Sequence, residues 1–218
     1  MSFEKNKYKI VKKVISEELC DFLCSYLLIK EYAISEIYKN KIFQPNGYLG
    51  TFGDGQINNF EDENKWLDKS FSCYGDVAIE TLQAKLTSVM EEHTKLKLVP
   101  TYSYFRIYQN KSELKKHIDR PSCEISSTLN LGGDPWPIYV ENKKNKIKID
   151  LNPSDFLIYR GMELPHWREP FKGFKCVQIF MHWNDINGPF KETLKFDGRP
   201  CLGYPTKDTT KKLNLKIK

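Results

Sequence analysis

The chain lacks the patterns that mark secreted and membrane-spanning proteins. Its 218 residues include six cysteines, but these form no CxxC pair and no regular framework. No apolar run approaches the roughly 20 residues needed to cross a bilayer, and the N-terminus has no apolar signal core. We therefore expect reduced thiols, a cytoplasmic location and no membrane partner.

Arginine is also scarce. Only five of the 34 basic residues are arginine, and the lysines are dispersed through polar stretches. A net charge of +6 distributed in this way is typical of a solvated surface, so we expect no nucleic-acid partner. Four of the arginines fall close to the motif described below, namely Arg106, Arg120, Arg160 and Arg168.

Internal repeats and linkers rich in Pro, Gly or Ser are absent too. The length suits one hydrophobic core, so we expect a single domain over residues 1–218. Its predicted parts are a helical support over about residues 1–97, a β-rich core over about 98–190 and a C-terminal extension over about 191–218. The sequence leaves the oligomeric state open.

Two amphipathic helices are predicted in the N-terminal part. Ser16 is a suitable N-cap for the first, and Asp76 to His93 form the second. The apolar stripe of the first helix is predicted to contain Leu19, Phe22, Leu23, Tyr26 and Leu27. Between the helices, Asn46–Glu63 is rich in Gly, Asn and Asp, which favours a loop that closes over a site.

After Pro100 the pattern changes to short strands separated by turn residues. The predicted strands are Thr101–Tyr108, Cys123–Leu131, Pro137–Glu141, Lys146–Leu151, Asp155–Tyr159 and Lys175–Trp183, with an earlier one at Lys7–Ile15. Evenly spaced short strands favour a sandwich or jelly-roll barrel. We therefore predict an α+β, mostly β fold, with the helices packed on the outside.

Histidine is rare, yet two of the four histidines belong to a specific arrangement. His117 and Asp119 stand at i and i+2, so on a strand both side chains project to one face. His166 follows 47 residues later, a separation that a jelly roll can close. Two imidazoles and one carboxylate on one face of an octahedron are typical of non-haem Fe(II) oxygenases.

Two further residues strengthen this pattern. Lys175 follows His166 by nine residues and begins a predicted strand. A buried cation there needs an anion, which a dicarboxylate cosubstrate would supply, although a solvated strand-edge lysine fits the sequence as well. Tyr108 could add a phenol hydrogen bond to the same cosubstrate, or belong to the core.

At this point the sequence resembles the 2-oxoglutarate/Fe(II) dioxygenases, and within them the prolyl 4-hydroxylase subgroup. The resemblance covers roughly residues 100–184 and rests on Tyr108, the His117–Asp119 pair, the strand containing Thr128, and His166 followed by Lys175. It implies a double-stranded β-helix. It also implies dependence on Fe(II), 2-oxoglutarate and O2, with ascorbate as a candidate stimulant.

The resemblance assigns roles residue by residue. His117, Asp119 and His166 become the iron ligands, and Lys175 becomes the partner of the distal carboxylate of 2-oxoglutarate, assisted by Tyr108. Thr128 is a further cosubstrate candidate, at a strand where some relatives have a tyrosine. If Lys175 does not hold the carboxylate, Arg106 and Arg160 are the alternatives.

Substrate recognition is predicted from the residues around the motif. Arg106 shares strand parity with Tyr108, and Arg120 follows Asp119 directly; either could hold a carboxylate or carbonyl group, or form a structural salt bridge. Trp136 and Tyr139 are candidates for an aromatic surface suited to a proline ring or an extended peptide. Trp183 is a candidate for the core or the pocket wall.

Three functions remain open. The first is a hydroxylase of a peptidyl proline that releases succinate and CO2, and the second is a hydroxylase of a small molecule or free amino acid. The third is a jelly-roll module with a non-catalytic metal site, which is disfavoured because a structural zinc site normally has four protein ligands.

Overall fold

The computed structural model describes residues 2–40, 50–52, 70–191 and 193–204. Of the predicted lid Asn46–Glu63, only residues 50–52 are described, and the rest lies outside the described residues. Three α-helices are present in the described chain, namely α1 (Phe3–Asn6), α2 (Glu17–Lys39) and α3 (Val77–Thr94). Among the described residues, none of these helices is both long enough and apolar enough to cross a membrane.

Eleven strands form two antiparallel sheets. The strands are β1 (Tyr8–Val11), β2 (Thr51–Phe52), β3 (Phe71–Tyr74), β4 (Leu98–Gln109), β5 (Leu114–His117), β6 (Ile125–Gly133), β7 (Ile138–Asn142), β8 (Asn145–Ile149), β9 (Phe156–Arg160), β10 (His166–Arg168) and β11 (Lys175–Asp185). The larger sheet has the order β1-β9-β6-β11-β4-β3-β2, and the smaller has the order β5-β10-β7-β8. Two short 3-10 helices, η1 (Pro121–Cys123) and η2 (Lys195–Gly198), complete the described elements.

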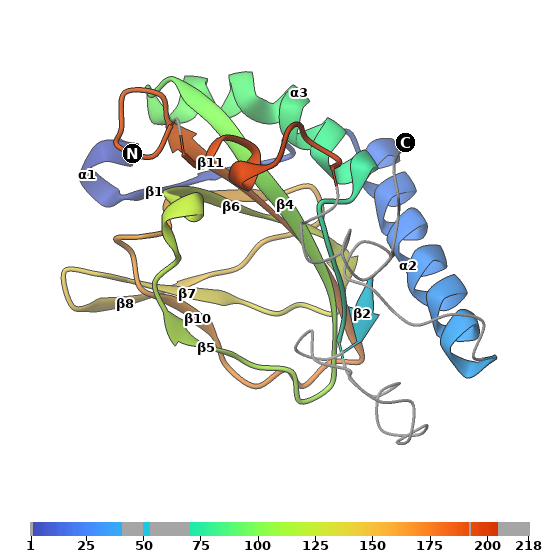
Figure 1. The fold of residues 1–218 in the computed structure, drawn as a ribbon. Helices are drawn as coiled ribbons and strands as arrows, with labels where there is room; N and C mark the ends of the chain where they lie inside the picture. The colour runs from blue at the N-terminus through green and yellow to red at the C-terminus, as the bar shows by residue number, and fades with distance from the viewer. Residues whose placement is uncertain (1, 41–49, 53–69, 192, 205–218) are drawn as a thin grey trace.

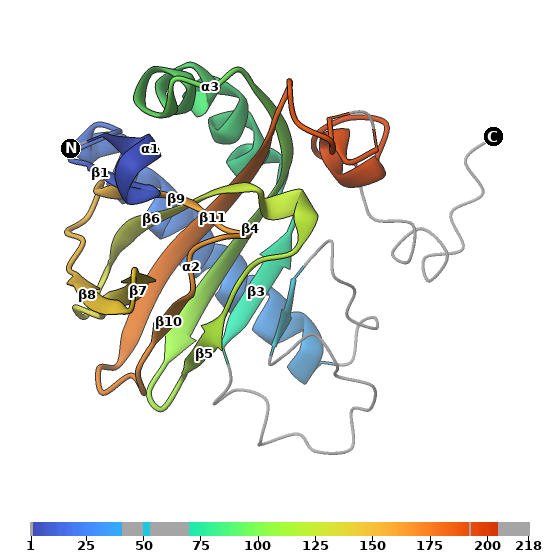
Figure 2. The ribbon, with the colours of Figure 1, turned by 90° about the vertical axis from the view of Figure 1, so that its left-hand side faces the viewer.

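The two sheets form facing layers, and the helices α2 and α3 lie on the outer side of the larger sheet (Figures 1 and 2). This arrangement confirms the predicted mostly β jelly roll with helices on the outside. The predicted strands all occur with shifted ends, whereas β2, β3, β5 and β10 were not predicted. These four strands have two to four residues each, too few to show a clear alternation in the sequence.

Strand alternation divides the larger sheet into two chemically different faces. On β11, Val177, Ile179 and Met181 belong to the core shared with the helices, whereas Phe180 and His182 point to the opposite side and line a pocket between the sheets. Because side chains alternate along a strand, the odd and even positions of β11 have different environments. The main core therefore lies between the larger sheet and the helices.

Both long helices begin at the predicted caps. The Ser16 hydroxyl accepts the Leu19 N–H at 3.2 Å, and Asp76 accepts the N–H groups that open α3. The buried side of α2 differs from the predicted stripe, however, because Leu19 and Phe22 are 37% and 64% exposed. The helix instead packs Cys20, Leu23, Leu27 and Ile34 against the sheet.

The chain after β11 is attached to the larger sheet by a buried ion pair. The guanidinium of Arg199 lies 2.7 Å from the carboxylate of Glu80 on α3, and the two side chains are 4% and 1% exposed. Arg199 also donates to the Thr101 carbonyl, and Glu80 accepts the Ser103 N–H. This pair joins α3, β4 and the C-terminal segment.

Breaking this pair should destabilise the fold strongly. Arg199→Met leaves the Glu80 carboxylate buried without a cation, so we expect the free energy of unfolding to fall by about 3–5 kcal/mol. The double variant Glu80→Met/Arg199→Met should be less destabilised than the single one, because no charge remains buried. Urea denaturation measures both, and a single variant as stable as the wild type would contradict the assignment.

Candidate metal centre and adjoining pocket

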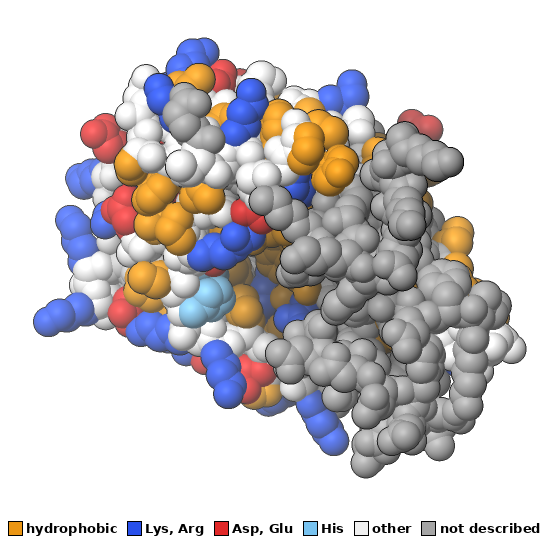
Figure 3. Space-filling model, in the orientation of Figure 1, with side chains coloured by type: hydrophobic (Ala, Val, Ile, Leu, Met, Phe, Trp, Pro, Cys, Tyr) orange, Lys and Arg blue, Asp and Glu red, His pale blue; other side chains and the backbone are white. Residues whose placement is uncertain are grey.

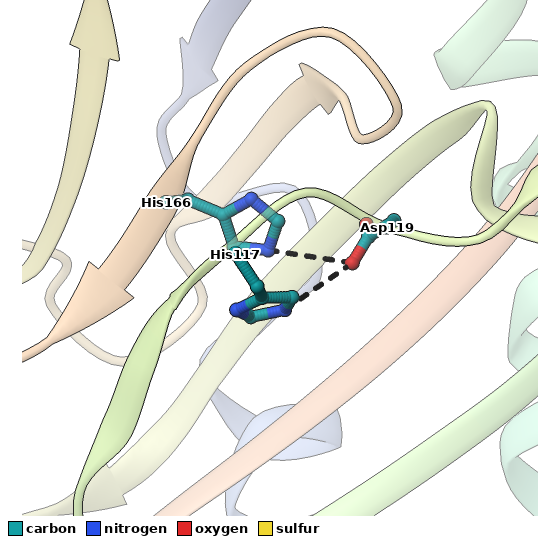
Figure 4. Close-up of side chains that lie close together, drawn as sticks. All are labelled: His117, Asp119 and His166. Atoms are coloured by element: carbon teal, nitrogen blue, oxygen red, sulfur yellow. Dashed lines mark ion pairs between the residues drawn. The ribbon is translucent and has the colours of Figure 1, made fainter.

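Three predicted ligands converge between the sheets. His117 is the last residue of β5, Asp119 follows that strand, and His166 opens β10, where it pairs with His117. Asp119 Oδ1 lies 3.5 Å from His117 Nε2 and 3.4 Å from His166 Nε2 (Figure 4). Bonds of about 2.1 Å to one octahedral metal would separate neighbouring donor atoms by about 3 Å. Both separations from Asp119 therefore fit a single ion with a small contraction, and all three donor atoms lie within 4.8 Å of one another.

The backbone sets the imidazole tautomers for metal binding. His117 Nδ1 lies 2.8 Å from the Lys115 carbonyl, and His166 Nδ1 lies 3.0 Å from the Leu164 carbonyl. A carbonyl oxygen only accepts, so each Nδ1 carries the proton. In a neutral imidazole this leaves the lone pair of Nε2 for a metal ion, whereas a protonated imidazole in the same position donates its Nε2–H to Asp119.

The carboxylate is suited to remain charged. Burial disfavours the anion of Asp119, but hydrogen bonds from His117 and His166 outweigh this effect and hold the pKa of Asp119 well below its usual range. Asp119 is nearly buried, whereas His117 is partly exposed at the rim. The space-filling view of this side shows a histidine beside a hollow that contains hydrophobic and basic side chains (Figure 3).

An aromatic pocket adjoins the three ligands. Besides His117, Asp119 and His166, its walls contain four tyrosines, one phenylalanine and one arginine. They are Tyr102, Tyr104, Arg106 and Tyr108 from β4, Tyr159 from β9 and Phe180 from β11. The even positions of β4 from Tyr102 to Tyr108 all line the pocket, so this long strand supplies most of one wall.

His182 completes the polar end of the pocket. Its ring packs on Tyr102 with 4.6 Å between ring centroids, and its Nδ1 lies 2.9 Å from the Ser126 hydroxyl. Burial lowers the pKa of His182 to about 4, so this imidazole is neutral near pH 7. His182 has no functional role in the sequence analysis, although its even position on β11 is the signal that places it inside.

Lys175 occupies a different position from the one expected. It shares strand parity with Val177 and Ile179, so its ammonium points to the helix side of the larger sheet. There it forms an ion pair with Glu31 of α2. Lys175 is not among the described residues that line the pocket.

The remaining predicted residues divide between the two sides of the larger sheet. Arg106 and Tyr108 line the pocket. Thr128 is fully buried between the sheets and donates to Gln178 Oε1 at 3.1 Å. Trp136 packs against Tyr108 with 4.7 Å between ring centroids. Trp183 lies in the core on the helix side, where its indole N–H donates to Thr87.

Arg120 forms a structural contact instead of lining the pocket. Its guanidinium makes two hydrogen bonds to the carboxylate of Asp197, at 3.0 and 2.8 Å, and lies over the ring of Tyr102. Of the two readings left open by the sequence, the structure thus shows the salt bridge. Arg160 contacts Glu163 and the ring of Phe3, away from the described pocket wall.

Arg168 is a buried cation on the inner side of β10, next to the pocket wall but not among the described residues that line it. It stands two residues after His166 on β10 and is 1% exposed. It donates to two neutral acceptors, the Trp136 carbonyl and Gln178 Oε1, while its Nε has no partner. Within the described part of the chain no carboxylate pairs with it, and burial lowers its pKa. The parity of Arg168 with His166 is the sequence signal that places both inside.

Removal of any of the three ligands should abolish tight metal binding. We expect His117→Ala, Asp119→Ala and His166→Ala to lose the Co(II) absorption bands that the wild type develops on titration, because each leaves only two protein ligands. His93→Ala, at the end of α3, is the control and should bind as the wild type does. A ligand variant with wild-type affinity would show that this residue does not bind the ion.

No protein-family model and no curated protein matches the chain. Solved structures do resemble it. A prolyl-4-hydroxylase from Pseudomonas putida aligns with a TM-score of 0.62 and 11% identity over 84% of this chain and 95% of its own. A prolyl hydroxylase from Trichoplax adhaerens, in complex with a peptide of hypoxia inducible factor, has a TM-score of 0.56 and 16% identity over 84% and 86% of the two chains.

A third structure, HygX from Streptomyces hygroscopicus with nickel, 2-oxoglutarate and hygromycin B bound, has a TM-score of 0.57 and 10% identity over 85% of each chain. These identities are low, so the likeness concerns the arrangement of the backbone. The chain has the jelly-roll fold of the 2-oxoglutarate/Fe(II) oxygenases, including the prolyl 4-hydroxylases.

Proposed function

We propose that the chain is an Fe(II)- and 2-oxoglutarate-dependent hydroxylase. The observation that carries this proposal is the convergence of His117, Asp119 and His166 on one point at the edge of a pocket. Three protein ligands leave half of an octahedron for exogenous groups, as in the facial-triad oxygenases. When bound, iron with 2-oxoglutarate and O2 supplies the oxidation, which converts 2-oxoglutarate to succinate and CO2 and hydroxylates the substrate.

The protein's own residues would orient the reactants and exclude water. Tyr159 packs edge-on against His166, with ring centroids 4.7 Å apart, and so fixes the plane of that ligand. Tyr104 and Phe180, which are paired on the neighbouring strands β4 and β11, lie side by side on one wall with 6.4 Å between ring centroids. These aromatic walls would reduce the access of water to the open side of the ion.

We assign the distal carboxylate of 2-oxoglutarate to Arg168 in place of Lys175. A buried guanidinium with only neutral acceptors is costly, and an incoming carboxylate would offset that cost. Gln178 and Thr128 extend the same polar group, since Gln178 Oε1 accepts from both Arg168 and Thr128. Tyr108 lines the pocket and packs against Trp136, the ring over which the Arg168 guanidinium lies.

The cosubstrate assignment predicts different effects for the cations. Arg168→Gln should raise the Kd of 2-oxoglutarate for the Mn(II)-loaded protein by about 30-fold, which corresponds to on the order of 2 kcal/mol for a buried charged pair. Lys175→Gln should lower stability, because Glu31 is left buried, but change that Kd by less than about threefold.

Calorimetric titration without O2 measures these affinities, with the melting temperature of each variant recorded beside them. Arg168→Lys keeps the charge and should recover part of the affinity. An effect of Lys175→Gln alone would return the role to Lys175. An effect confined to Arg106→Gln would assign the carboxylate to the arginine in the pocket wall.

For the substrate we propose a peptidyl proline. Tyr104 and Phe180 provide apolar ring surfaces in the pocket wall, against which a proline ring could pack. Two of the structural neighbours are prolyl hydroxylases, one of them with a bound peptide, whereas HygX holds hygromycin B. A small-molecule hydroxylase is therefore the second candidate.

Succinate release tests the proposed function. The Fe(II)-loaded protein should convert 2-oxoglutarate to succinate, faster in the presence of proline-containing peptides than of matched peptides with alanine at the proline position. Mass spectrometry should show a gain of one oxygen in the substrate. The His166→Ala protein is the inactive control. If the protein binds metal but releases no succinate under any of these conditions, the result would favour the non-catalytic module.

A further inference from the structure

The two oxygens of the Asp119 carboxylate contact different groups. Its Oδ1 faces both imidazoles, whereas its Oδ2 accepts the Ser126 hydroxyl at 2.7 Å. The two oxygens therefore have separate roles in the structure. One is available for an ion, and the other is occupied by the protein.

The Ser126 hydroxyl has a single proton, and its neighbours determine where that proton goes. The oxygen lies 2.7 Å from Asp119 Oδ2, 3.0 Å from the Cys123 carbonyl and 2.9 Å from His182 Nδ1. Hydrogen bonds to a charged acceptor are the stronger ones, so the proton is best placed on Asp119. His182, being neutral, then donates its Nδ1–H to Ser126, and the three side chains form one directed chain.

Gly161 forms the other part of this support. Its carbonyl accepts the Asp119 N–H at 2.9 Å, so the backbone of the ligand is fixed as well. A Cβ built at position 161 would lie within 3.0 Å of Asp119 Oδ2, the Cys123 carbonyl and Ser126 Oγ. The backbone of Gly161 does not lie in the left-handed region, so backbone strain does not require glycine here. The Asp119 carboxylate, the Cys123 carbonyl and the Ser126 hydroxyl together exclude a side chain.

We infer that Ser126 and Gly161 are positioning residues that make Asp119 bind a metal ion through one oxygen only, Oδ1. This inference rests on the proposed metal centre and deepens it. A carboxylate that bound through both oxygens would occupy a second coordination position. By holding Oδ2, Ser126 keeps that position open for the cosubstrate, and Gly161 leaves the space in which this orientation fits.

The experiment compares Ser126→Ala with Ser127→Ala. The two serines are neighbours on β6, and both are fully buried, but Ser127 donates to the Met181 carbonyl and has the opposite parity. Both substitutions therefore remove one buried hydroxyl, but only Ser126→Ala removes a contact with Asp119. Co(II) serves as the probe, with its affinity and its absorption spectrum measured at a temperature well below the melting point of each variant.

We expect Ser126→Ala to raise the Kd of Co(II) by about 10- to 100-fold, the range for loss of a group that orients a metal ligand. Its Co(II) spectrum should change, and Gly161→Ala should do the same through displacement of the carboxylate. Ser127→Ala should keep the wild-type spectrum and a Kd within about threefold, whatever its melting temperature. Ser126→Thr, which retains a hydroxyl, should recover part of the affinity.

The 2-oxoglutarate affinity of the Co(II)-saturated proteins provides the second measurement. It should fall about tenfold in Ser126→Ala, because the freed Oδ2 competes for the coordination position. Equal Co(II) affinity and an unchanged spectrum in Ser126→Ala and wild type would overturn the inference while leaving the metal centre intact. Failure of the wild type to bind Co(II) would instead overturn the proposed function.

Discussion

The contact of Asp119 with two histidines joins the two sheets of the barrel. His117 and His166 belong to neighbouring strands of the smaller sheet, whereas Asp119 is fixed through Ser126 on β6 and Gly161 after β9, both of the larger sheet. The position of the three donor atoms therefore depends on how the two layers face one another.

The two covered faces of the larger sheet differ in their content of polar side chains. Its outer face is apolar because the helices cover it, and its inner face contains Ser126, Thr128, Gln178 and His182. Buried polar groups require partners, and most of these bond to one another in short chains. The same interior also contains the buried guanidinium of Arg168 and the Asp119 carboxylate.

The described segment after β11 supports the site from outside. Asp197 accepts two hydrogen bonds from Arg120, the residue that follows Asp119, and a third from Tyr74. Arg199 ties the same segment to Glu80. Arg120 also lies over Tyr102, which forms part of the pocket wall. The C-terminal extension thus contacts the neighbourhood of the metal ligands, although the sequence showed no motif there.

The sequence by itself determined the long elements and the three donor residues. Helix caps and alternating strands are local patterns. An HxD pair with a later histidine can be recognised in the sequence without knowing the exact strand boundaries. Only the tertiary structure decided which face each strand presents. Lys175 stands at a suitable distance along the chain, yet strand parity turns it toward Glu31, whereas Arg168 turns inward with His166. A shift of one residue in strand register exchanges the two faces, and register depends on contacts between distant strands that no local pattern contains.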